Sequence, residues 1–260
     1  MAEILVGTSG YDYPEWRGVL YPHELPREEF LAFYAEQFSA LELNYTYYGM
    51  PDEAQMTSMV RRSNGKLRFS VKANKSLTHE VSVSAWRSDA RAFREAMRPL
   101  ASRGLLLSIL LQFPQSFHYE IDERRYLDGL VGELRDLPLV VEFRHDSWQN
   151  PRVYDAFRKR GLGWCITDMP ALRRLPARRA VVTAKSAYLR FHGRNAESWH
   201  GTDARSRYEY RYEDAELAEY VPLVAEIAGA ANLIQIYFNN HAKGNAVVNA
   251  QKMRILTAGI

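Results

Sequence analysis

The sequence predicts a single (β/α)8 barrel of the TIM type, with a parallel eight-stranded sheet, over residues 1–260. Eight short runs rich in β-branched or aromatic residues, most of them separated by a helix-like stretch, indicate this fold. The length of 260 residues suits one such barrel, which typically needs ~250 residues. Polar or ionisable residues end the runs, and barrel enzymes carry their chemistry at the carboxyl ends of the strands. We therefore expect one domain with long βα loops and a site at its C-terminal mouth.

The predicted strands and helices alternate along the chain. The strands are residues 4–6, 41–43, 68–71, 105–111, 139–141, 165–167, 188–189 and 234–238. Apolar residues spaced by three and four predict helices over residues 28–38, 51–62, 86–102, 122–135, 150–160, 214–228 and 245–257. Asn150 before Pro151 is typical of a helix start. After Asp168 we expect a short connecting helix that Pro170 and Pro176 interrupt, so the sixth unit is the least regular.

The composition is that of an ordinary globular protein, with 47% hydrophobic and 25% charged residues. No apolar stretch approaches the ~20 residues that cross a bilayer, and the N-terminus lacks a basic region and a cleavage site. The one cysteine, Cys165, excludes an internal disulfide and an all-cysteine metal cluster. We expect a cytoplasmic protein without a membrane partner. The net charge of +3 does not by itself indicate nucleic-acid binding.

Ionisable residues two apart near the strand ends predict a site inside the barrel. Side chains alternate across a strand, so residues two apart share a face. This applies to Glu42 with Asn44, Ser70 with Lys72, Glu142 with Arg144, Arg190 with His192, and Tyr237 with Asn239. An unpaired charge buried against the helix layer is very costly. We therefore expect these side chains to converge in a wet chamber at the mouth.

The residue types predict acid–base chemistry on an anion. The predicted catalytic residues are Glu42, Glu142, His192 and Asp168, with Glu42 or Glu142 as general base and His192 as general acid. The cations Lys72, Arg144 and Arg190 suit a phosphate or carboxylate. Backbone amides near Thr8, Ser9 and Gly10 would add to this anion pocket. The other predicted substrate-binding residues are Asn44, Gln112, Tyr237, Asn239 and Asn240.

Each of these residues also has a structural interpretation. The carboxylates and cations could form buried salt bridges that fix the barrel, and His192 could be a satisfied interior histidine. A divalent-metal site of Glu42, Glu142, Asp168 and His192 is a weaker alternative, because no paired-histidine spacing occurs and arginines compete for the carboxylates. We expect no metal and no organic cofactor.

Two segments outside the strands are candidates for ligand contacts. Arg173, Arg174, Arg178 and Arg179 form a basic cluster, which is either a solvated loop or a basic lip beside the mouth. The stretch 193–212 is polar, rich in arginine and tyrosine, and long for a βα loop. Such a loop over a barrel mouth is a candidate lid.

Several motifs resemble the DUF72 family, also called YecE-like proteins, over almost the whole chain. They are GTSGY at 7–11, WRG at 16–18, NYTYY at 44–48, FSVKA at 69–73, LQFP at 111–114, EFRHDSW at 142–148, DMP at 168–170, YLRFHG at 188–193 and YFNN at 237–240. The resemblance implies a TIM-type barrel but no activity, because the family is named for its unknown function. Endonuclease IV and the sugar isomerases are analogous at the level of fold alone.

Three functions follow as hypotheses. The first is an enzyme that acts on a small anionic, phosphate-bearing substrate by acid–base chemistry, with hydrolysis or another phosphoester reaction as its class. The second is a nucleic-acid-binding protein or an endonuclease IV-like phosphodiesterase, in which the basic lip and rim tyrosines contact phosphates and bases. The third is a non-catalytic barrel that binds a metabolite. The sequence predicts no particular oligomeric state.

Overall fold

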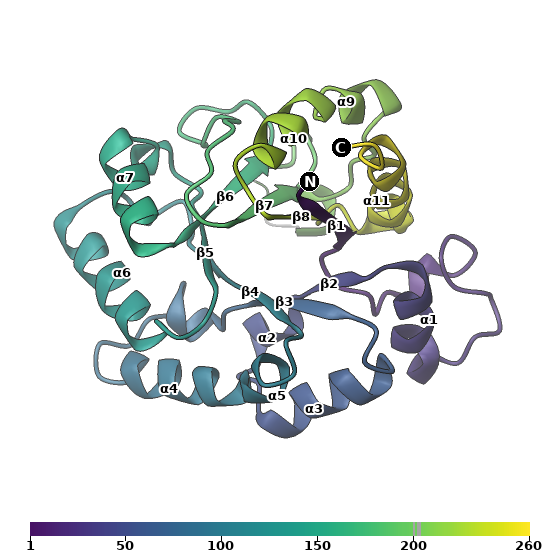
Figure 1. Ribbon diagram of the computed structural model, residues 1–260, viewed down its shortest axis with the longest axis horizontal. Coiled ribbons are helices and arrows are strands. Elements are labelled where there is room, and N and C mark those ends of the chain that lie inside the picture. The colour runs from purple at the N-terminus through teal and green to yellow at the C-terminus, as the bar shows by residue number, and fades with distance from the viewer. Residues whose placement is uncertain (200, 202–203) are drawn as a thin grey trace.

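Eight parallel strands curl into a nearly closed barrel in the computed structural model, which describes residues 1–199, 201 and 204–260 (Figure 1). Their order is β1-β8-β7-β6-β5-β4-β3-β2, and β1 meets β2 through a bridge between Ser9 and Glu42. The strands are β1 (Glu3–Thr8), β2 (Ala40–Leu43), β3 (Arg68–Lys72), β4 (Leu106–Gln112), β5 (Leu139–Glu142), β6 (Gly163–Asp168), β7 (Ser186–Phe191) and β8 (Leu233–Phe238). The predicted TIM-type fold is confirmed.

Helices surround the sheet, as Figure 1 shows. The α-helices are α1 (Phe30–Gln37), α2 (Tyr45–Tyr48), α3 (Glu53–Arg62), α4 (Trp86–Ala96), α5 (Arg98–Ala101), α6 (Ile121–Glu133), α7 (Pro151–Arg160), α8 (Ala204–Arg207), α9 (Asp214–Ala218), α10 (Val221–Ala228) and α11 (Asn245–Leu256). Short 3-10 helices cover Pro14–Trp16, Arg27–Glu29, Lys75–Leu77, Asp146–Trp148 and Ala242–Gly244.

Local sequence sets where these helices begin and break. Asn150 caps α7 by accepting a hydrogen bond from the Val153 amide at 3.2 Å, as its position before Pro151 predicts. The predicted helices over 86–102 and 214–228 are each two helices in the structure. Both breaks precede a proline, Pro99 or Pro222, because proline lacks an amide donor and its ring clashes with the carbonyl four residues earlier.

The sixth βα unit departs from the regular pattern. Residues 169–185, all of which the structure describes, form no helix between β6 and β7. An extended segment takes the place of the helix against the sheet, since residues 180–182 pack on the hydrophobic core. The Thr183 hydroxyl donates to the Leu162 carbonyl at 2.6 Å and accepts from the Trp164 amide at 2.8 Å. The predicted short helix after Asp168 is therefore wrong, and the two prolines, Pro170 and Pro176, account for its absence.

Buried side chains fill two layers, one between sheet and helices and one inside the barrel. Inside the barrel, Leu5, Leu110 and Tyr237 belong to one apolar cluster. Gln235, which pairs with Leu5 and precedes Tyr237 on β8, joins the barrel strands by accepting from Ser70 at 2.7 Å and donating to Ser108 at 2.8 Å. Polar side chains therefore already lie among the apolar ones at this level, and the charged side chains of the strand ends lie closer to the mouth.

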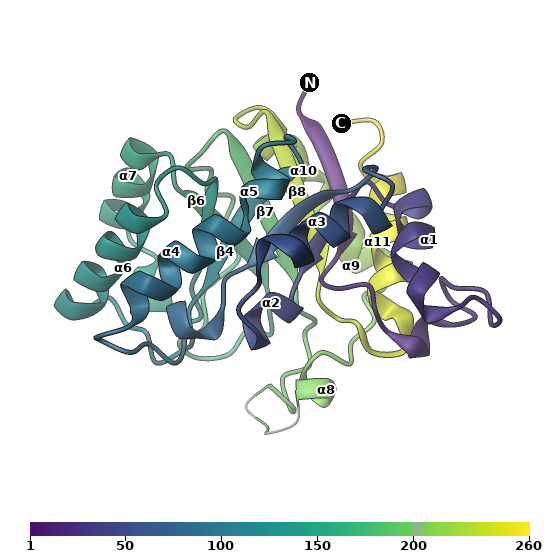
Figure 2. The ribbon, with the colours of Figure 1, turned by 90° about the horizontal axis from the view of Figure 1, so that it is seen from below.

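The mouth lies at the end of the barrel away from the chain start. In Figure 2 the N-terminus lies above the barrel and α8 projects below it, at the end where the parallel strands finish. Among the residues that the structure describes, no helix is long and apolar enough to cross a membrane.

Candidate functional site

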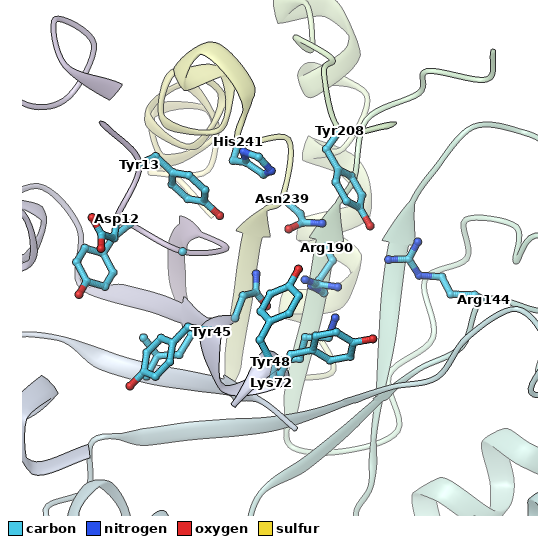
Figure 3. Close-up of a pocket in the computed structure, with 15 residues that line it drawn as sticks. Asp12, Tyr13, Tyr45, Tyr48, Lys72, Arg144, Arg190, Tyr208, Asn239 and His241 are labelled. Carbon is cyan, nitrogen blue, oxygen red and sulfur yellow. The ribbon is translucent and has the colours of Figure 1, made fainter. Parts of the chain in front are cut away.

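A cavity of about 350 Å³ opens at the barrel mouth (Figure 3). Residues in or just after the ends of six strands, β1, β2, β3, β5, β7 and β8, contribute to it, and Tyr208 reaches it from the long loop after β7. Its lining residues are Gly10, Tyr11, Asp12, Tyr13, Leu43, Asn44, Tyr45, Tyr47, Tyr48, Lys72, Arg144, Arg190, Tyr208, Asn239 and His241. The cavity therefore has a cationic floor of Lys72, Arg144 and Arg190 and walls that are largely aromatic.

Arg190 joins two buried carboxylates beneath the cavity. Its two terminal nitrogens lie 2.6 Å from Glu42 Oε1 and 2.6 Å from Glu142 Oε2. Tyr188, two residues earlier on β7, donates its hydroxyl to the other oxygen of Glu42 at 2.6 Å. Both oxygens of Glu42 are thus bound by protein donors. Such charge-assisted hydrogen bonds hold Arg190 in one orientation at the cavity floor.

Arg144 extends this network toward His192. The Arg144 Nε donates to Glu142 Oε1, and one terminal nitrogen lies 3.2 Å from His192 Nε2. Asn239 approaches the other ring nitrogen of His192 at 3.2 Å. The Arg144 guanidinium also lies 5.5 Å from the centre of the Trp199 ring. Protein groups on several sides therefore fix Arg144.

The charges of this network are set by its arginines. Burial by itself raises the pKa of Glu142, but the charges of Arg144 and Arg190 outweigh it and hold that pKa well below its ordinary value. Burial, with the positive charge of Arg144, lowers the pKa of His192 to about 3. Glu142 is therefore a carboxylate and His192 a neutral imidazole near pH 7.

Lys72 differs from the two arginines because no carboxylate of the described residues is paired with it. No hydrogen bond from its Nζ is found in the described part of the chain, and Nζ lies 4.1 Å from the centre of the Tyr47 ring. Burial, together with the charge of Arg190, lowers the pKa of Lys72 to about 7. The amine is therefore poised between its charged and neutral forms at physiological pH.

The aromatic walls are of two kinds. Tyr13 is fixed between Trp16 and His241, whose rings lie 4.8 and 4.6 Å from its own, and its hydroxyl donates to the Ser9 carbonyl at 3.1 Å. Gly10 has a φ of +88°, and a Cβ there would lie 2.7 Å from the Tyr13 hydroxyl. Glycine thus lets Tyr13 pack against the backbone. Tyr48, in contrast, is 76% exposed at the rim.

The structure brings most of the predicted site residues together. Gly10, Asn44, Lys72, Arg144, Arg190 and Asn239 line the cavity. Glu42, Glu142 and His192 lie directly beneath it in the network. The predicted convergence of side chains two apart on β2, β3, β5 and β7 is therefore seen in the geometry.

The predicted cradle of backbone amides is wrong. The Thr8 amide donates to the Tyr34 hydroxyl at 3.0 Å, the Ser9 amide to the Phe238 carbonyl at 2.9 Å, and the Gly10 amide to the Glu42 carbonyl at 2.8 Å. The Ser9 and Gly10 amides close the barrel, the Thr8 amide joins β1 to α1, and none of the three is free for a ligand. The Thr8 side chain also bonds to Tyr34 of α1, on the helix side of β1.

Asp168 and Asn240 also lie away from the cavity. Asp168 binds Arg194 at 3.1 Å together with the hydroxyls of Tyr212 and Tyr220. Asn240 donates to the Tyr210 carbonyl at 2.8 Å and to Asn249. Both residues anchor the chain after β7. The structure therefore places them in the packing of the lid candidate and not beside the cationic floor.

Gln112 and Tyr237 face the interior but do not line the cavity. Gln112 donates to the carbonyl of the adjacent Phe113 at 2.8 Å. The Tyr237 hydroxyl pairs with Ser70 at 3.0 Å in the polar layer below the mouth. Their predicted contact with a ligand has no support in this geometry.

The sequence prediction missed several residues of the site. Tyr188 is one of them, although its spacing of two from Arg190 is the same signal that predicts His192 as a site residue. Tyr208 lines the cavity from the predicted lid, residues 193–212, of which 200, 202 and 203 lie outside the described residues. His241 lacks such a signal, because it follows the end of β8 and its place depends on the stack with Tyr13.

At least one arginine of the basic lip is engaged in contacts within the protein. Arg178 pairs with Glu219 at 3.3 Å and its guanidinium lies 4.7 Å from the Tyr220 ring centre.

With regard to metals, no group of three histidine, cysteine, aspartate or glutamate side chains within residues 1–199, 201 and 204–260 is placed to hold an ion. In the site itself, arginine and tyrosine donors occupy the carboxylates of Glu42 and Glu142.

These features define a TIM-type barrel protein whose mouth holds a buried ion network under an aromatic-walled cavity. The chain belongs to the DUF72 family, described as a protein family of unknown function, whose model matches residues 5–258. It is 26% identical to the UPF0759 protein YunF of Bacillus subtilis over 96% of this chain and 93% of YunF.

Solved structures of the family share this barrel. A DUF72 family protein from Thermotoga maritima is 33% identical, with a TM-score of 0.89 over 98% of this chain and 99% of that chain. One from Enterococcus faecalis is 25% identical, with a TM-score of 0.86 over 98% and 95% of the two chains.

Proposed function

We propose that the mouth binds a small phosphate-bearing substrate and that the protein is an enzyme of the phosphoester hydrolase class. One observation supports this most strongly: protein donors already bind the two carboxylates of the floor, while no carboxylate among the described residues is paired with Lys72. The floor holds three basic side chains against two carboxylates. A bound anion would balance this excess.

Lys72 is the proposed acid–base group, in place of the two glutamates. Glu142 is a weak base, because the arginines hold its pKa well below the ordinary value. An amine with a pKa of about 7 exchanges its proton readily at physiological pH. A phosphate bound beside it favours the protonated form, which can donate its proton to the leaving oxygen as the P–O bond breaks. Water adds to phosphorus, and its proton passes to the neutral amine, which restores the charged form. Arg144 and Arg190 then stabilise the charge on the phosphoryl oxygens.

Ligand-dependent thermal stabilisation tests the anion site. Wild-type protein is heated with sugar phosphates, nucleoside monophosphates and short oligonucleotides, each beside its unphosphorylated analogue. We expect phosphorylated small molecules to raise the melting temperature of the wild type and to lose most of this effect in Lys72→Met. No protein group hydrogen-bonds to Lys72 Nζ in the described chain, so this variant leaves no partner unpaired.

Lys159→Met is the matched control, because it removes the same charge from an exposed position on α7. It should respond to ligands as the wild type does. Release of inorganic phosphate from the stabilising compounds then tests the reaction, and Lys72→Met should release it at least about a hundredfold more slowly. Equal stabilisation of wild type and Lys72→Met by every phosphate compound would exclude the anion site.

A further inference from the structure

We propose that the aromatic side of the cavity stacks on the planar base of the substrate, so that the phosphate-bearing ligand is a nucleoside phosphate. This deepens the proposed function and rests on it for the phosphate. Seven of the fifteen lining residues are tyrosine or histidine. Every nucleobase offers a flat π-face, and stacking on an aromatic side chain tolerates any base.

Tyr48 is the side chain placed to make this stack. It meets Tyr47 at 90° with 5.0 Å between ring centres, and it remains 76% exposed at the cavity rim. The neighbouring Tyr47 is already engaged, because Lys72 Nζ lies over its ring at 4.1 Å. Tyr48 therefore keeps most of its ring available while lying close to the proposed phosphate-binding amine.

The opposite wall is made of aromatic rings that stack on one another. Tyr13 and His241 stack in parallel, with an interplanar angle of 7°, and lie across the cavity from Tyr48 in Figure 3. A ligand with a planar ring loses less conformational freedom on entering such a space than a flexible one does. The cavity volume of about 350 Å³ falls in the ~300–1,000 Å³ range of small-molecule sites.

The charges of the cavity differ between its two ends. Arg144 and Arg190 lie toward one end and Asp12 toward the other, as Figure 3 shows. Arg27 holds Asp12 at 2.7 Å. Because this pair carries little net charge, that end of the cavity offers no net positive charge to a second phosphate, while the carboxylate oxygens can accept hydrogen bonds from sugar hydroxyls and base N–H groups. This arrangement fits a ligand with one anionic end and one neutral, donor-bearing end, which is the chemistry of a nucleoside monophosphate.

Calorimetric titration separates the base from the phosphate. The ligands are the four ribonucleoside monophosphates, ribose 5-phosphate, which lacks a base, and adenosine, which lacks a phosphate. The proteins are the wild type, Tyr48→Leu and Tyr48→Phe, and the last is the matched control because it keeps the ring. We expect at least one nucleotide to bind the wild type at least about fivefold more tightly than ribose 5-phosphate.

Tyr48→Leu should lose that advantage while its affinity for ribose 5-phosphate stays unchanged, and Tyr48→Phe should keep it. Equal affinity of ribose 5-phosphate and all four nucleotides for the wild type overturns the base site and leaves the anion site standing. Adenosine binding that depends on Tyr48, without any gain from phosphate, supports the base site and overturns the proposed function. Absence of binding by every ligand overturns both.

Discussion

Arg190 and Glu42 form an ion pair at 2.6 Å in which the two side chains are 1% and 0% exposed. The same guanidinium binds Glu142 at 2.6 Å, so one cation separates two buried carboxylates. Breaking a buried pair costs far more than breaking a surface pair, because the remaining charge lacks both water and a partner. The network therefore contributes to stability as well as to the charge of the cavity floor.

Replacing Arg190 should destabilise the protein strongly. We expect Arg190→Met to lower the free energy of unfolding by about 3–5 kcal/mol, as for other buried ion pairs that lose one partner. Urea denaturation monitored by circular dichroism measures this change. The control is Lys66→Met, which removes an exposed pair with Glu36 and should cost less than about 1 kcal/mol. Similar losses in the two variants would contradict this role of Arg190.

His192 should make the protein sensitive to mild acid. Its pKa is about 3 when folded, against an ordinary 6.5, so the unfolded chain binds more protons in this interval. Stability is therefore lost as the pH falls below 6.5. We expect His192→Gln to reduce this loss between pH 7 and 5 by up to about 1.4 kcal/mol per pH unit, measured by urea denaturation. His23→Gln, at an exposed position, should lose stability as the wild type does.

The alternation of side chains along each strand separates the residues that face the barrel interior from those that face the helices, and it would have placed Asp168 correctly. Glu142 with Arg144 and Arg190 with His192 converge because each pair points into the barrel. Asp168 is out of phase with Cys165, which faces the barrel interior on the same strand. Applied strictly, the alternation of side chains across a strand places Asp168 on the helix side, where it is found.

The same rule accounts for Asn240, which is out of phase with Tyr237 and Asn239, and for Thr8 on β1. The sequence predicted a short, interrupted sixth helix, whereas the structure has none there, because Pro170 and Pro176 disfavour a helix more strongly than the prediction allowed. Contacts between distant loops, such as the stack of His241 on Tyr13, could not be predicted from the sequence. Such stacking depends on tertiary packing and not on local periodicity.

Lys72 should be unusually reactive toward amine reagents near neutral pH. With a pKa of about 7, much of the amine is neutral and nucleophilic at pH 7.5, whereas an ordinary lysine is almost fully protonated. Limited labelling with an activated ester, followed by peptide mass spectrometry, measures the rate at each lysine. Lys72 should be labelled faster than the exposed Lys159 at pH 7.5. Labelling of Lys72 that begins above about pH 9 would refute the lowered pKa.

Asp168 organises the loop that carries Tyr208 to the cavity. It binds Arg194 near the start of this loop and Tyr212 at its end. The Tyr212 hydroxyl also accepts the Gly193 amide at 2.8 Å, so one hydroxyl bridges Asp168 and the chain directly after β7. Tyr220 binds the same carboxylate without contacting Gly193 through any hydrogen bond found among the described residues.

Tyr212→Phe should therefore loosen the start of this loop, because it removes the acceptor of a buried amide. We expect a destabilisation of about 1–3 kcal/mol and faster hydrogen exchange at the Gly193 amide. Tyr220→Phe is the matched control, since it removes one hydroxyl from Asp168 and leaves the Gly193 hydrogen bond in place. Exchange at Gly193 should stay at the wild-type rate in this control. Equal exchange rates in the two variants would show that the Tyr212 hydroxyl does not hold the loop.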